Sequence, residues 1–394
     1  MRVIWVSPST LDTFLHNVAF FHILGQFAEL GHKVTFLAVR SKNVRRFDNR
    51  KVSLLAFPLR YVPLVSSVMF AITMSLFLPI FILVSKSDLV ILSPDVSILS
   101  SLPGLFVSKF RKVKFVLDIR SVPVEMVGFR GYLQKFWFPV SVLIAKRLFD
   151  GITIITPSMK KEVCNYFYVD PEKVGVWTSG VSDSLFNPEN PTIRREDLRR
   201  NLGLAEKFIL FYHGTFSSTR GLTETIEAIK ILKNKYHDIV FFLLGTGSTV
   251  AALRALIRKE GLLENVIIHN PVVQSEVPKF INMCDVCIVP LPNHPYWRHQ
   301  SPLKLLEYLA MEKVVILTDI PAHRSIVGDA DCGLYISSVN PTEIARAIEY
   351  AYFNKENLDE RGKIGRRIIK EKYTWGKVAR DLENYLSSIN GGTN

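Results

Sequence analysis

The chain has 394 residues, of which 48% are hydrophobic and 22% charged, and its formal net charge is +13. This composition excludes a disordered protein, and the length predicts two domains, each with its own core. Residues 1–183 contain 22 Lys and Arg against 12 Asp and Glu, so this half carries +10 of the net charge. A basic half indicates an acidic partner, such as a phosphate or an anionic lipid. No motif typical of RNA-binding modules is present, so we expect no nucleic-acid partner.

The four cysteines predict a reduced, cytoplasmic protein, because no secretory signal is recognisable. Cys284 and Cys287 have the spacing of a zinc or redox pair. No second ligand pair follows them, however, and the surrounding MCDVCIV is typical of a buried strand. We therefore interpret both as core residues and expect neither a metal nor another cofactor.

In the first half, short apolar runs alternate with helical segments, which predicts a parallel sheet covered on both faces. The clearest helix is Asp12–Leu30, closed by Gly31. Ligands bind beyond the carboxyl ends of such strands, so Ser7–Thr10, Asp118–Val124 and Thr156–Met159 are expected to line one rim. The expected strands are residues 2–6, 33–39, 52–57, 88–92, 113–118 and 151–155.

The run Tyr61–Ser85 is uncharged and long enough to span a bilayer. A span at this place would divide the strands of one sheet between the two sides of the membrane. The alternatives are an unusually apolar helix that covers the sheet, or such a helix with one face in lipid. We favour the last, a peripheral contact with the membrane surface. The cations expected to assist it are Arg45, Arg46, Arg50, Lys51 and Arg60.

The composition changes after Trp177, where polar residues, Pro and Gly accumulate, and KFILFYHGT then starts a second α/β series. We place the boundary near Asn190–Leu204, giving an N-terminal domain of residues 1–190 and a C-terminal domain of residues 191–372. The segment 373–390 is expected to be an amphipathic helix. Strands of the second series are expected at residues 207–212, 239–244, 265–269, 285–289, 313–318 and 333–336.

Two strand–loop–helix units in the second half carry groups that suit phosphate. In HGTFSSTRG, Gly214 permits close backbone approach, and Arg220 stands where the next helix begins. In SPLKLLEYLAMEK, Ser301-Pro302 is a favourable helix start, and Lys304 adds a cation in the first turn. Glu307 shares the face of Lys304, and its carboxylate could accept from sugar hydroxyls. The alternatives are a surface arginine beside a turn, and a solvated Lys–Glu pair.

The motifs of other nucleotide-binding and hydrolytic classes are missing. The first strand is followed by SPSTLD instead of G-x-G-x-x-G, and GTGSTV at 245–250 lacks the third glycine. Neither a Walker A motif nor a G-x-S-x-G elbow is present. Asp329 and Asp331 could bind a divalent metal, but we interpret them as turn residues.

Taken in order, these motifs resemble the retaining nucleotide-sugar glycosyltransferases of the GT-B fold, glycosyltransferase family 4. SGVSDSLFNP (179–188) resembles a hinge signature of that family, and HGTFSSTRG resembles its G-x-x-x-x-x-K-G loop, with Arg220 in place of the lysine. FFLLGTGS, VIIHNPVV, SPLKLLEYLAMEKVVILTDIP and YTWGKVARDLENYL follow in family order. The resemblance implies an α/β fold of two Rossmann-like domains that face a central cleft, with the C-terminal helix crossing back to the first domain.

The resemblance also implies roles for individual residues. Glu307 matches the second glutamate of a Glu-x7-Glu motif and should hold the nucleotide ribose, whereas the first glutamate is replaced by His299. We expect His299 and Gln300 near the donor sugar, and Ser9, Thr10, Asp118 and Arg120 near the acceptor; Asp118 and Arg120 could alternatively only brace their loop. The residues expected to bind the donor nucleotide and its phosphates are Gly214, Arg220, Gly245, Val272, Val273, Ser301, Leu303, Lys304 and Glu307. Those expected to act in catalysis are Asp118, Arg120, Arg220 and Lys304.

The implied reaction is transfer of a sugar from a UDP- or GDP-sugar to an acceptor hydroxyl or phosphate, with retention of configuration and without a metal. The basic first half and its apolar helix suggest a lipid-linked or cell-surface glycan as the acceptor. Such a protein would be cytoplasmic and peripheral on the inner face of the cell membrane. The alternatives are a sugar-nucleotide epimerase of the same fold, and a catalytically inactive membrane-associated scaffold.

Overall fold

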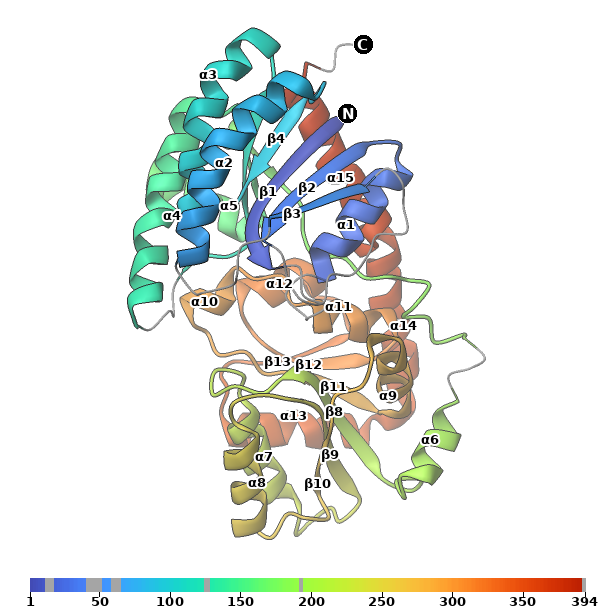
Figure 1. Cartoon of the computed structure of the whole chain (residues 1–394). Helices are drawn as coiled ribbons and strands as arrows, with labels where there is room; N and C mark the ends of the chain where they lie inside the picture. The colour runs from blue at the N-terminus through green and yellow to red at the C-terminus, as the bar shows by residue number, and fades with distance from the viewer. Residues whose placement is uncertain (11–17, 40–51, 58–64, 124–127, 191–193, 392–394) are drawn as a thin grey trace. The chain divides into compact units, whose positions relative to one another are not determined.

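The computed structural model describes residues 1–10, 18–39, 52–57, 65–123, 128–190 and 194–391. The chain divides into two compact units. Unit 1 contains Met1–Ser179 and Trp375–Asn394, and unit 2 contains Gly180–Thr374. Each unit has one parallel sheet with helices on both faces, as the sequence predicts (Figure 1).

The sheet of unit 1 has seven parallel strands in the order β3-β2-β1-β4-β5-β6-β7. The first six are the strands expected from the apolar runs, whereas the three-residue β7 was not predicted. This strand order reverses between β1 and β4, which is where the ligand crevice of a doubly wound sheet forms. The strands are β1 (Arg2–Thr10), β2 (Lys33–Val39), β3 (Val52–Phe57), β4 (Leu89–Leu92), β5 (Lys114–Ile119), β6 (Gly151–Ile154) and β7 (Val174–Val176).

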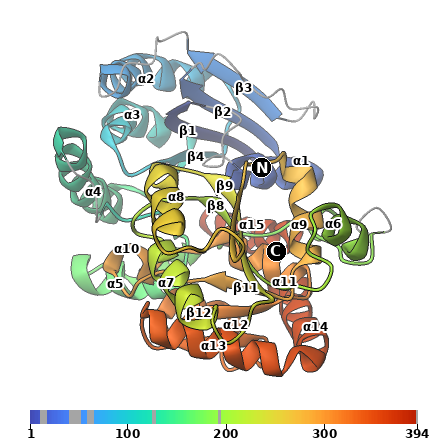
Figure 2. The same ribbon diagram turned by 90° about the horizontal axis from the view of Figure 1, so that it is seen from below.

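Helices cover both faces of this sheet because alternate side chains of each strand point to opposite sides. Ile4 and Val6 belong to the core that includes Phe70 of α2, whereas Trp5 between them meets Phe20 of α1 at 5.6 Å between ring centroids. Seen from below, α2 and α3 lie together on one side of the strands and α1 on the other (Figure 2). The helices of unit 1 are α1 (Val18–Glu29), α2 (Val65–Val84), α3 (Ser101–Arg111), α4 (Gly128–Leu148), α5 (Pro157–Phe167) and α15 (Trp375–Ile389), with the 3-10 turns η2 (Val96–Ser100) and η3 (Pro171–Lys173).

The C-terminal helix α15 returns to unit 1, as expected. Its apolar stripe buries Trp375, Val378 and Leu382, and Trp375 stacks on His22 of α1 at 5.2 Å between ring centroids. The Tyr385 hydroxyl accepts from the Ile152 amide at 3.1 Å. The helix is therefore fixed to both α1 and the edge of the sheet.

The uncharged run expected at 61–85 forms α2 over the sheet. Residues 61–64 lie outside the described part of the chain, as do Arg45, Arg46, Arg50, Lys51 and Arg60 and residues 12–17 of the first expected helix. In the part that the structure describes, we find no helix with the length and apolar character needed to cross a bilayer.

Unit 2 repeats the same architecture with six parallel strands in the order β10-β9-β8-β11-β12-β13, all expected from the sequence. The strands are β8 (Phe208–Thr215), β9 (Ile239–Thr246), β10 (Val266–His269), β11 (Val286–Val289), β12 (Val314–Thr318) and β13 (Gly333–Ile336). The helices are α6 (Arg195–Asn201), α7 (Leu222–Leu232), α8 (Val250–Lys259), α9 (Val277–Met283), α10 (Pro295–Arg298), α11 (Leu303–Ala310), α12 (Pro321–Val327), α13 (Pro341–Phe353) and α14 (Leu358–Ile368), with the short turns η4 (Gln274–Glu276), η5 (Lys355–Asn357) and η6 (Ile369–Tyr373).

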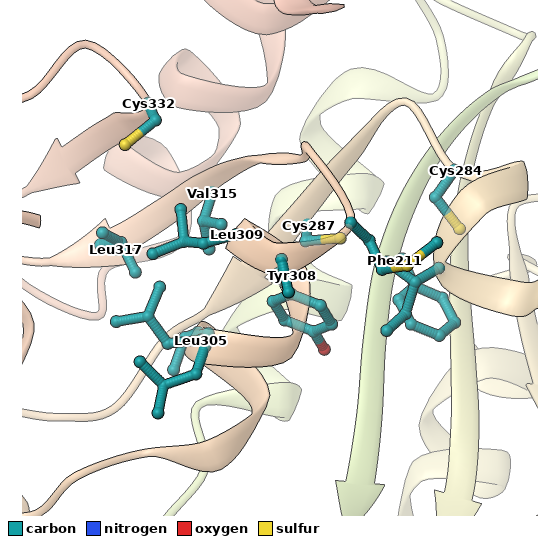
Figure 3. Close-up of a cluster of buried hydrophobic side chains, with 14 of the residues drawn as sticks. Phe211, Cys284, Cys287, Leu305, Tyr308, Leu309, Val315, Leu317 and Cys332 are labelled. Carbon is teal, nitrogen blue, oxygen red and sulfur yellow. The ribbon is translucent and has the colours of Figure 1, made fainter. Parts of the chain in front are cut away.

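Alternate side chains of β8 pack into two separate hydrophobic cores of unit 2, one on each face of the sheet. Phe211 belongs to one core with Tyr308 and Leu305 of α11 (Figure 3). Tyr212 belongs to the other core, together with residues of α7 and α13. Cys284 and Cys287 are buried in the first of these cores, as interpreted from the sequence. Burial raises the pKa of both thiols, so neither is a reactive thiolate.

The observed boundary between the units lies earlier than the one expected near Asn190–Leu204. Residues 180–190 belong to unit 2 because Val181 and Phe186 are buried in its core. In addition, the Val181 amide donates to Tyr373 O at 2.8 Å, and Arg366 donates to Phe186 O at 3.2 Å. Polar composition located a loop correctly, but it could not reveal that two apolar residues in that loop join the following domain.

Candidate functional site

The candidate donor site lies at the carboxyl ends of β8 and β11, where the strand order of unit 2 reverses. The segments that leave this edge of the sheet lead to α7 and α11. Parallel strand ends at such a reversal leave a crevice, and the helix that begins there can present free N–H groups. The sequence-predicted cations Arg220 and Lys304 belong to these two segments.

Lys304 is held by a tyrosine that the sequence analysis did not single out. Its ammonium donates to Tyr212 Oη at 2.7 Å and lies 3.9 Å from the centroid of the Tyr212 ring. The Tyr212 hydroxyl in turn donates to Thr215 O at 3.1 Å. Burial, and then the charge of Arg220, hold the pKa of Lys304 well below its usual value, while burial raises the pKa of Tyr212 to about 12. The charged form of Lys304 is thus disfavoured in the free protein, and a bound anion would stabilise it.

Arg220 lies over the indole of Trp297, with its Cζ 4.1 Å from the ring centroid. Its Nε is buried and has no hydrogen-bond partner among the described residues. Gly221, which follows it, is the N-cap of α7 with φ +66°, and a Cβ there would stand 2.3 Å from Pro290 O. Glycine at this position therefore brings the Arg220 loop against the segment after β11.

Glu307 faces His213 rather than forming a solvated pair with Lys304. Its Oε2 lies 3.0 Å from His213 Nε2, and only 9% of the residue is exposed. The His213 amide donates to the Tyr308 hydroxyl at 2.9 Å, which fixes the end of β8 on α11. The interpretation of Lys304 and Glu307 as a solvated pair is therefore wrong, because each side chain is directed to a different residue of β8.

The two predicted glycines at the strand ends lie side by side. Gly214 of β8 pairs with Gly245 of β9, and both have positive φ. A Cβ on Gly245 would stand 2.0 Å from Gly214 O, and a Cβ on Gly214 would stand 3.4 Å from Lys304 Nζ. The backbone at this edge is thus close to the lysine ammonium, without a side chain between them.

The helix α11 begins one residue later than the sequence predicted. Pro302 occupies the N-cap, with φ −73° and ψ 108°, and provides no side-chain cap, while Leu303 is the first helical residue. Ser301, expected to be the N-cap, is buried just before it. An extended Pro302 followed by Leu303 and Lys304 leaves first-turn amides to be satisfied by something other than a cap.

The remaining predicted donor residues are only partly gathered at this site. His299 and Gln300 form the short connection between α10 and α11, and Gln300 Nε2 is buried without a hydrogen-bond partner in the described structure. Val272 and Val273 follow β10, which β9 separates from β8. Val272 packs on a core of unit 2, while 68% of Val273 is exposed.

In unit 1, the predicted residues Asp118 and Arg120 form a cluster with Trp177. Asp118 Oδ1 accepts from Trp177 Nε1 at 2.9 Å and from Thr153 Oγ1 at 2.8 Å. Arg120 Nη1 donates to Trp177 O at 2.7 Å, and its Cζ lies 3.5 Å from the Trp177 ring centroid. The side chains of Ser9 and Thr10, at the end of β1, lie outside the described part of the chain.

This cluster is electrostatically unusual because it holds a buried carboxylate beside a half-buried guanidinium. Burial raises the pKa of Asp118 despite the nearby charge of Arg120, and burial lowers the pKa of Arg120 to about 10. Asp118 Oδ2 is buried and unpartnered among the described residues. One oxygen of Asp118 thus braces Trp177 and Thr153, while the other is left for a ligand or a proton.

The aspartates weighed as metal ligands are used in ion pairs. Asp329 lies 2.8 Å from Arg324 Nη1, and Asp331 lies 2.9 Å from Arg361 Nη2. Their interpretation as turn residues agrees with these contacts. No cluster of three or more His, Cys, Asp and Glu side chains with metal-binding geometry occurs in the described ranges.

Comparisons with known proteins agree with this geometry. Residues 194–368 match the family described as glycosyl transferases group 1. The D-inositol 3-phosphate glycosyltransferase of Paenarthrobacter aurescens is 23% identical over 254 residues, which make up 62% of this chain and 60% of that relative.

Solved structures resemble the whole chain. A glycosyltransferase from Rickettsia africae has a TM-score of 0.78 at 16% identity, covering 100% of this chain and 99% of that one. Anabaena HepE in complex with UDP has a TM-score of 0.77 at 13% identity, covering 98% and 100%. At these identities the likeness establishes the fold, which is GT-B.

Residues 194–368 are thus similar to the group 1 glycosyltransferases. The switch-point residues described above, from Tyr212 to Glu307, all lie within this matched segment. The narrower placement in glycosyltransferase family 4 stays a prediction from the sequence.

Proposed function

We propose that the protein transfers a sugar from a UDP- or GDP-sugar to a lipid-linked or cell-surface glycan, with retention of anomeric configuration. The observation that carries this proposal is the pair Arg220 and Lys304 at the switch point of a group 1 glycosyltransferase segment. The two cations come from segments that follow different strands, and the lysine is desolvated by burial. Such a pair suits a pyrophosphate, whose negative charge would stabilise both cations.

In the proposed reaction these cations act on the leaving group. As the bond between the sugar and the nucleoside diphosphate breaks, negative charge accumulates on the diphosphate oxygens. An ammonium and a guanidinium held in place can stabilise that charge without reorganisation, which is the role a metal ion fills at other sites. The acceptor would then attack from the face the leaving group has vacated, so positioning matters more than a protein nucleophile.

We assign the other contacts to the donor nucleotide from the positions of the residues around Lys304. The Glu307 carboxylate, which faces His213, would accept from the ribose hydroxyls, and first-turn amides at Leu303 and Lys304 would donate to phosphate. We place the base near Val272 and Val273, and the sugar near His299 and Gln300. The solved complex of HepE with UDP supports a uridine nucleotide as the first candidate.

We assign the acceptor to the switch point of unit 1. Ser9 and Thr10 end β1. Asp118 is the last residue but one of β5, which adjoins β4, and Arg120 directly follows that strand. The unpartnered Oδ2 of Asp118 supports a contact with an acceptor hydroxyl, and the half-buried Arg120 supports a contact with an acceptor phosphate. We place the protein on the cytoplasmic face of the cell membrane, where lipid-linked acceptors would be accessible.

Isothermal titration calorimetry with UDP and GDP tests the donor site first. We expect binding of one of them, with equal affinity in EDTA and in magnesium. A screen of nucleotide sugars against glycolipid acceptors then tests transfer, and NMR of the product's anomeric proton tests retention. Turnover of the nucleotide sugar without an acceptor would show an epimerase instead. Failure of folded protein to bind either nucleotide would refute the proposal and favour the scaffold.

A further inference from the structure

Two neighbouring helices of unit 1 expose apolar side chains on the sides that face away from the sheet. In α2 the buried residues recur every four positions at Phe70, Met74, Leu78 and Ile82. The exposed residues occupy the opposite stripe, and a second stripe of the same kind runs along α3. Together they form what we call the α2–α3 apolar face: Val68, Met69, Ile72, Leu76, Ile80, Leu83 and Val84 of α2, and Leu102, Phe106 and Phe110 of α3.

These side chains are strongly exposed on two helices that pack against each other (Figure 1). The solvent-accessible fraction is 71% for Leu76 and 75% for Phe110. Phe106 and Phe110 are themselves in contact, at 5.7 Å between ring centroids. Isolated exposed apolar residues are ordinary, but a continuous patch across two helices marks an interaction surface.

The face offers almost no hydrogen-bonding side chains. The residues of α2 include no charged side chain. The hydroxyls of Thr73 and Ser75 donate to Met69 O and Ala71 O, both at 2.8 Å, and are thereby satisfied within the helix. A typical protein–protein interface makes about one hydrogen bond per 100–200 Å². A surface with so few polar groups suits an occupant that needs none, such as lipid acyl chains.

One end of this face carries a cluster of cations. Lys86, Lys109, Arg111 and Lys112 are exposed around the C-terminal ends of α2 and α3. These two ends are tied together, because Arg111 Nη2 donates to Leu83 O at 2.6 Å. Four cations beside an apolar surface are complementary to anionic lipid headgroups above acyl chains.

The acidic residues of this part of the chain do not neutralise those cations. Segment 65–112 contains two acids, Asp88 and Asp95. Asp88 accepts from the Arg2 amide at 2.7 Å, and Asp95 accepts from the Ser97 amide at 2.7 Å. The four cations outnumber these two carboxylates, so the segment keeps a net charge of +2.

We propose that the α2–α3 apolar face docks on an anionic phospholipid bilayer. Its aliphatic and phenyl side chains enter the boundary between headgroups and acyl chains, and the four cations contact lipid phosphates. This deepens the proposed function, because it names the surface by which unit 1 reaches a lipid-linked acceptor. It does not require the donor site to bind a nucleotide, so the two proposals are tested by different measurements.

Flotation with lipid vesicles tests this surface. Wild-type protein is expected to float with vesicles of phosphatidylglycerol and phosphatidylcholine, and much less with phosphatidylcholine alone. The variant with Leu76→Ser, Ile80→Ser, Phe106→Ser and Phe110→Ser should lose at least about tenfold in partitioning, because four apolar side chains no longer enter the bilayer. The variant with Lys109→Gln and Lys112→Gln should lose about 25-fold in partitioning on the anionic vesicles, because each cation near such a surface contributes roughly fivefold.

A matched control uses exposed apolar residues of unit 2. Ile231 and Leu263 are 52% and 69% exposed, and the variant with Ile231→Ser and Leu263→Ser should float like the wild type. Equal thermal unfolding of all the variants excludes misfolding as the cause of any loss.

Three results would overturn the docking surface. The first is wild-type protein that does not float with anionic vesicles. The second is a variant with all four serine substitutions that floats like the wild type. The third is sedimentation showing that the wild type forms a dimer which the serine substitutions abolish, without flotation, because a second copy would then cover the face. If the protein floats with vesicles but does not bind UDP, the donor site is rejected and the docking surface is supported. If it binds UDP but does not float, only the docking surface is rejected.

Discussion

Replacing Lys304 by methionine should weaken UDP binding about tenfold while leaving the fold intact. In the structure its ammonium already donates to Tyr212 Oη at 2.7 Å. A charge-assisted bond to a diphosphate oxygen is worth about 1.5–3 kcal/mol, and giving up the bond to the uncharged Tyr212 hydroxyl costs about 1 kcal/mol. The net loss on substitution is therefore roughly 0.5–2 kcal/mol, and the middle of this range corresponds to about a factor of ten in Kd.

Calorimetric titration with UDP near neutral pH measures this difference directly. Lys259→Met is a matched control, because Lys259 is an exposed lysine of α8 in the same unit and its loss changes the charge equally. The control should bind UDP like the wild type. Thermal unfolding should show Lys304→Met at least as stable as the wild type, because the substitution removes a half-buried ammonium whose charged form the site disfavours. Unchanged UDP affinity in Lys304→Met would refute the assignment of the diphosphate to this site.

Three further predictions concern other residues of unit 2. Glu307→Gln should weaken UDP binding about tenfold but leave inorganic pyrophosphate binding unchanged, because only the ribose contact is lost; equal losses for both ligands, measured by calorimetry, would contradict the ribose assignment. Tyr212→Phe should change the pH dependence of UDP binding, since Tyr212 Oη orients the Lys304 ammonium; an identical pH profile would show that the hydroxyl has no part in binding. His323 is buried and its Nδ1–H donates to Thr318 O at 2.8 Å, and burial lowers its pKa from 6.5 to about 4. Because the unfolded chain then binds more protons, stability should fall as the pH drops from 6.5 to about 4, by up to ~3 kcal/mol. Urea unfolding across that range should show this slope in the wild type and a smaller one in His323→Gln, and equal slopes would exclude His323 as the cause.

Most of the sheet architecture was readable from the sequence, because buried parallel strands are continuous apolar runs. The strand β7 was missed since three residues, Val174–Val176, are too few to show a pattern. The start of α11 was misplaced by one residue, because Ser301 and Pro302 are both acceptable at a helix start. Propensity alone could not decide between them.

The candidate site was only half visible in the sequence. Arg220 and Lys304 could be found because each is a cation near the start of a helix, beside a loop of the kind that binds phosphate. This pattern is visible in a short stretch of sequence. Their partners Tyr212 and Trp297 could not be found in this way, since each belongs to a different segment and resembles a core aromatic residue. A hydroxyl whose partner is 92 positions away leaves no local pattern.

The paths of the chain at residues 179–180 and 374–375 have a mechanical consequence. Unit 2 is an uninterrupted stretch inserted into unit 1, so the polypeptide passes between the units twice. The two passages are fastened to each other just inside unit 2, where the Val181 amide donates to Tyr373 O and Val181 pairs with Thr374. Any rotation of one unit relative to the other must therefore deform two connected chain segments. Two joined segments resist torsion more than a single linker of the same length.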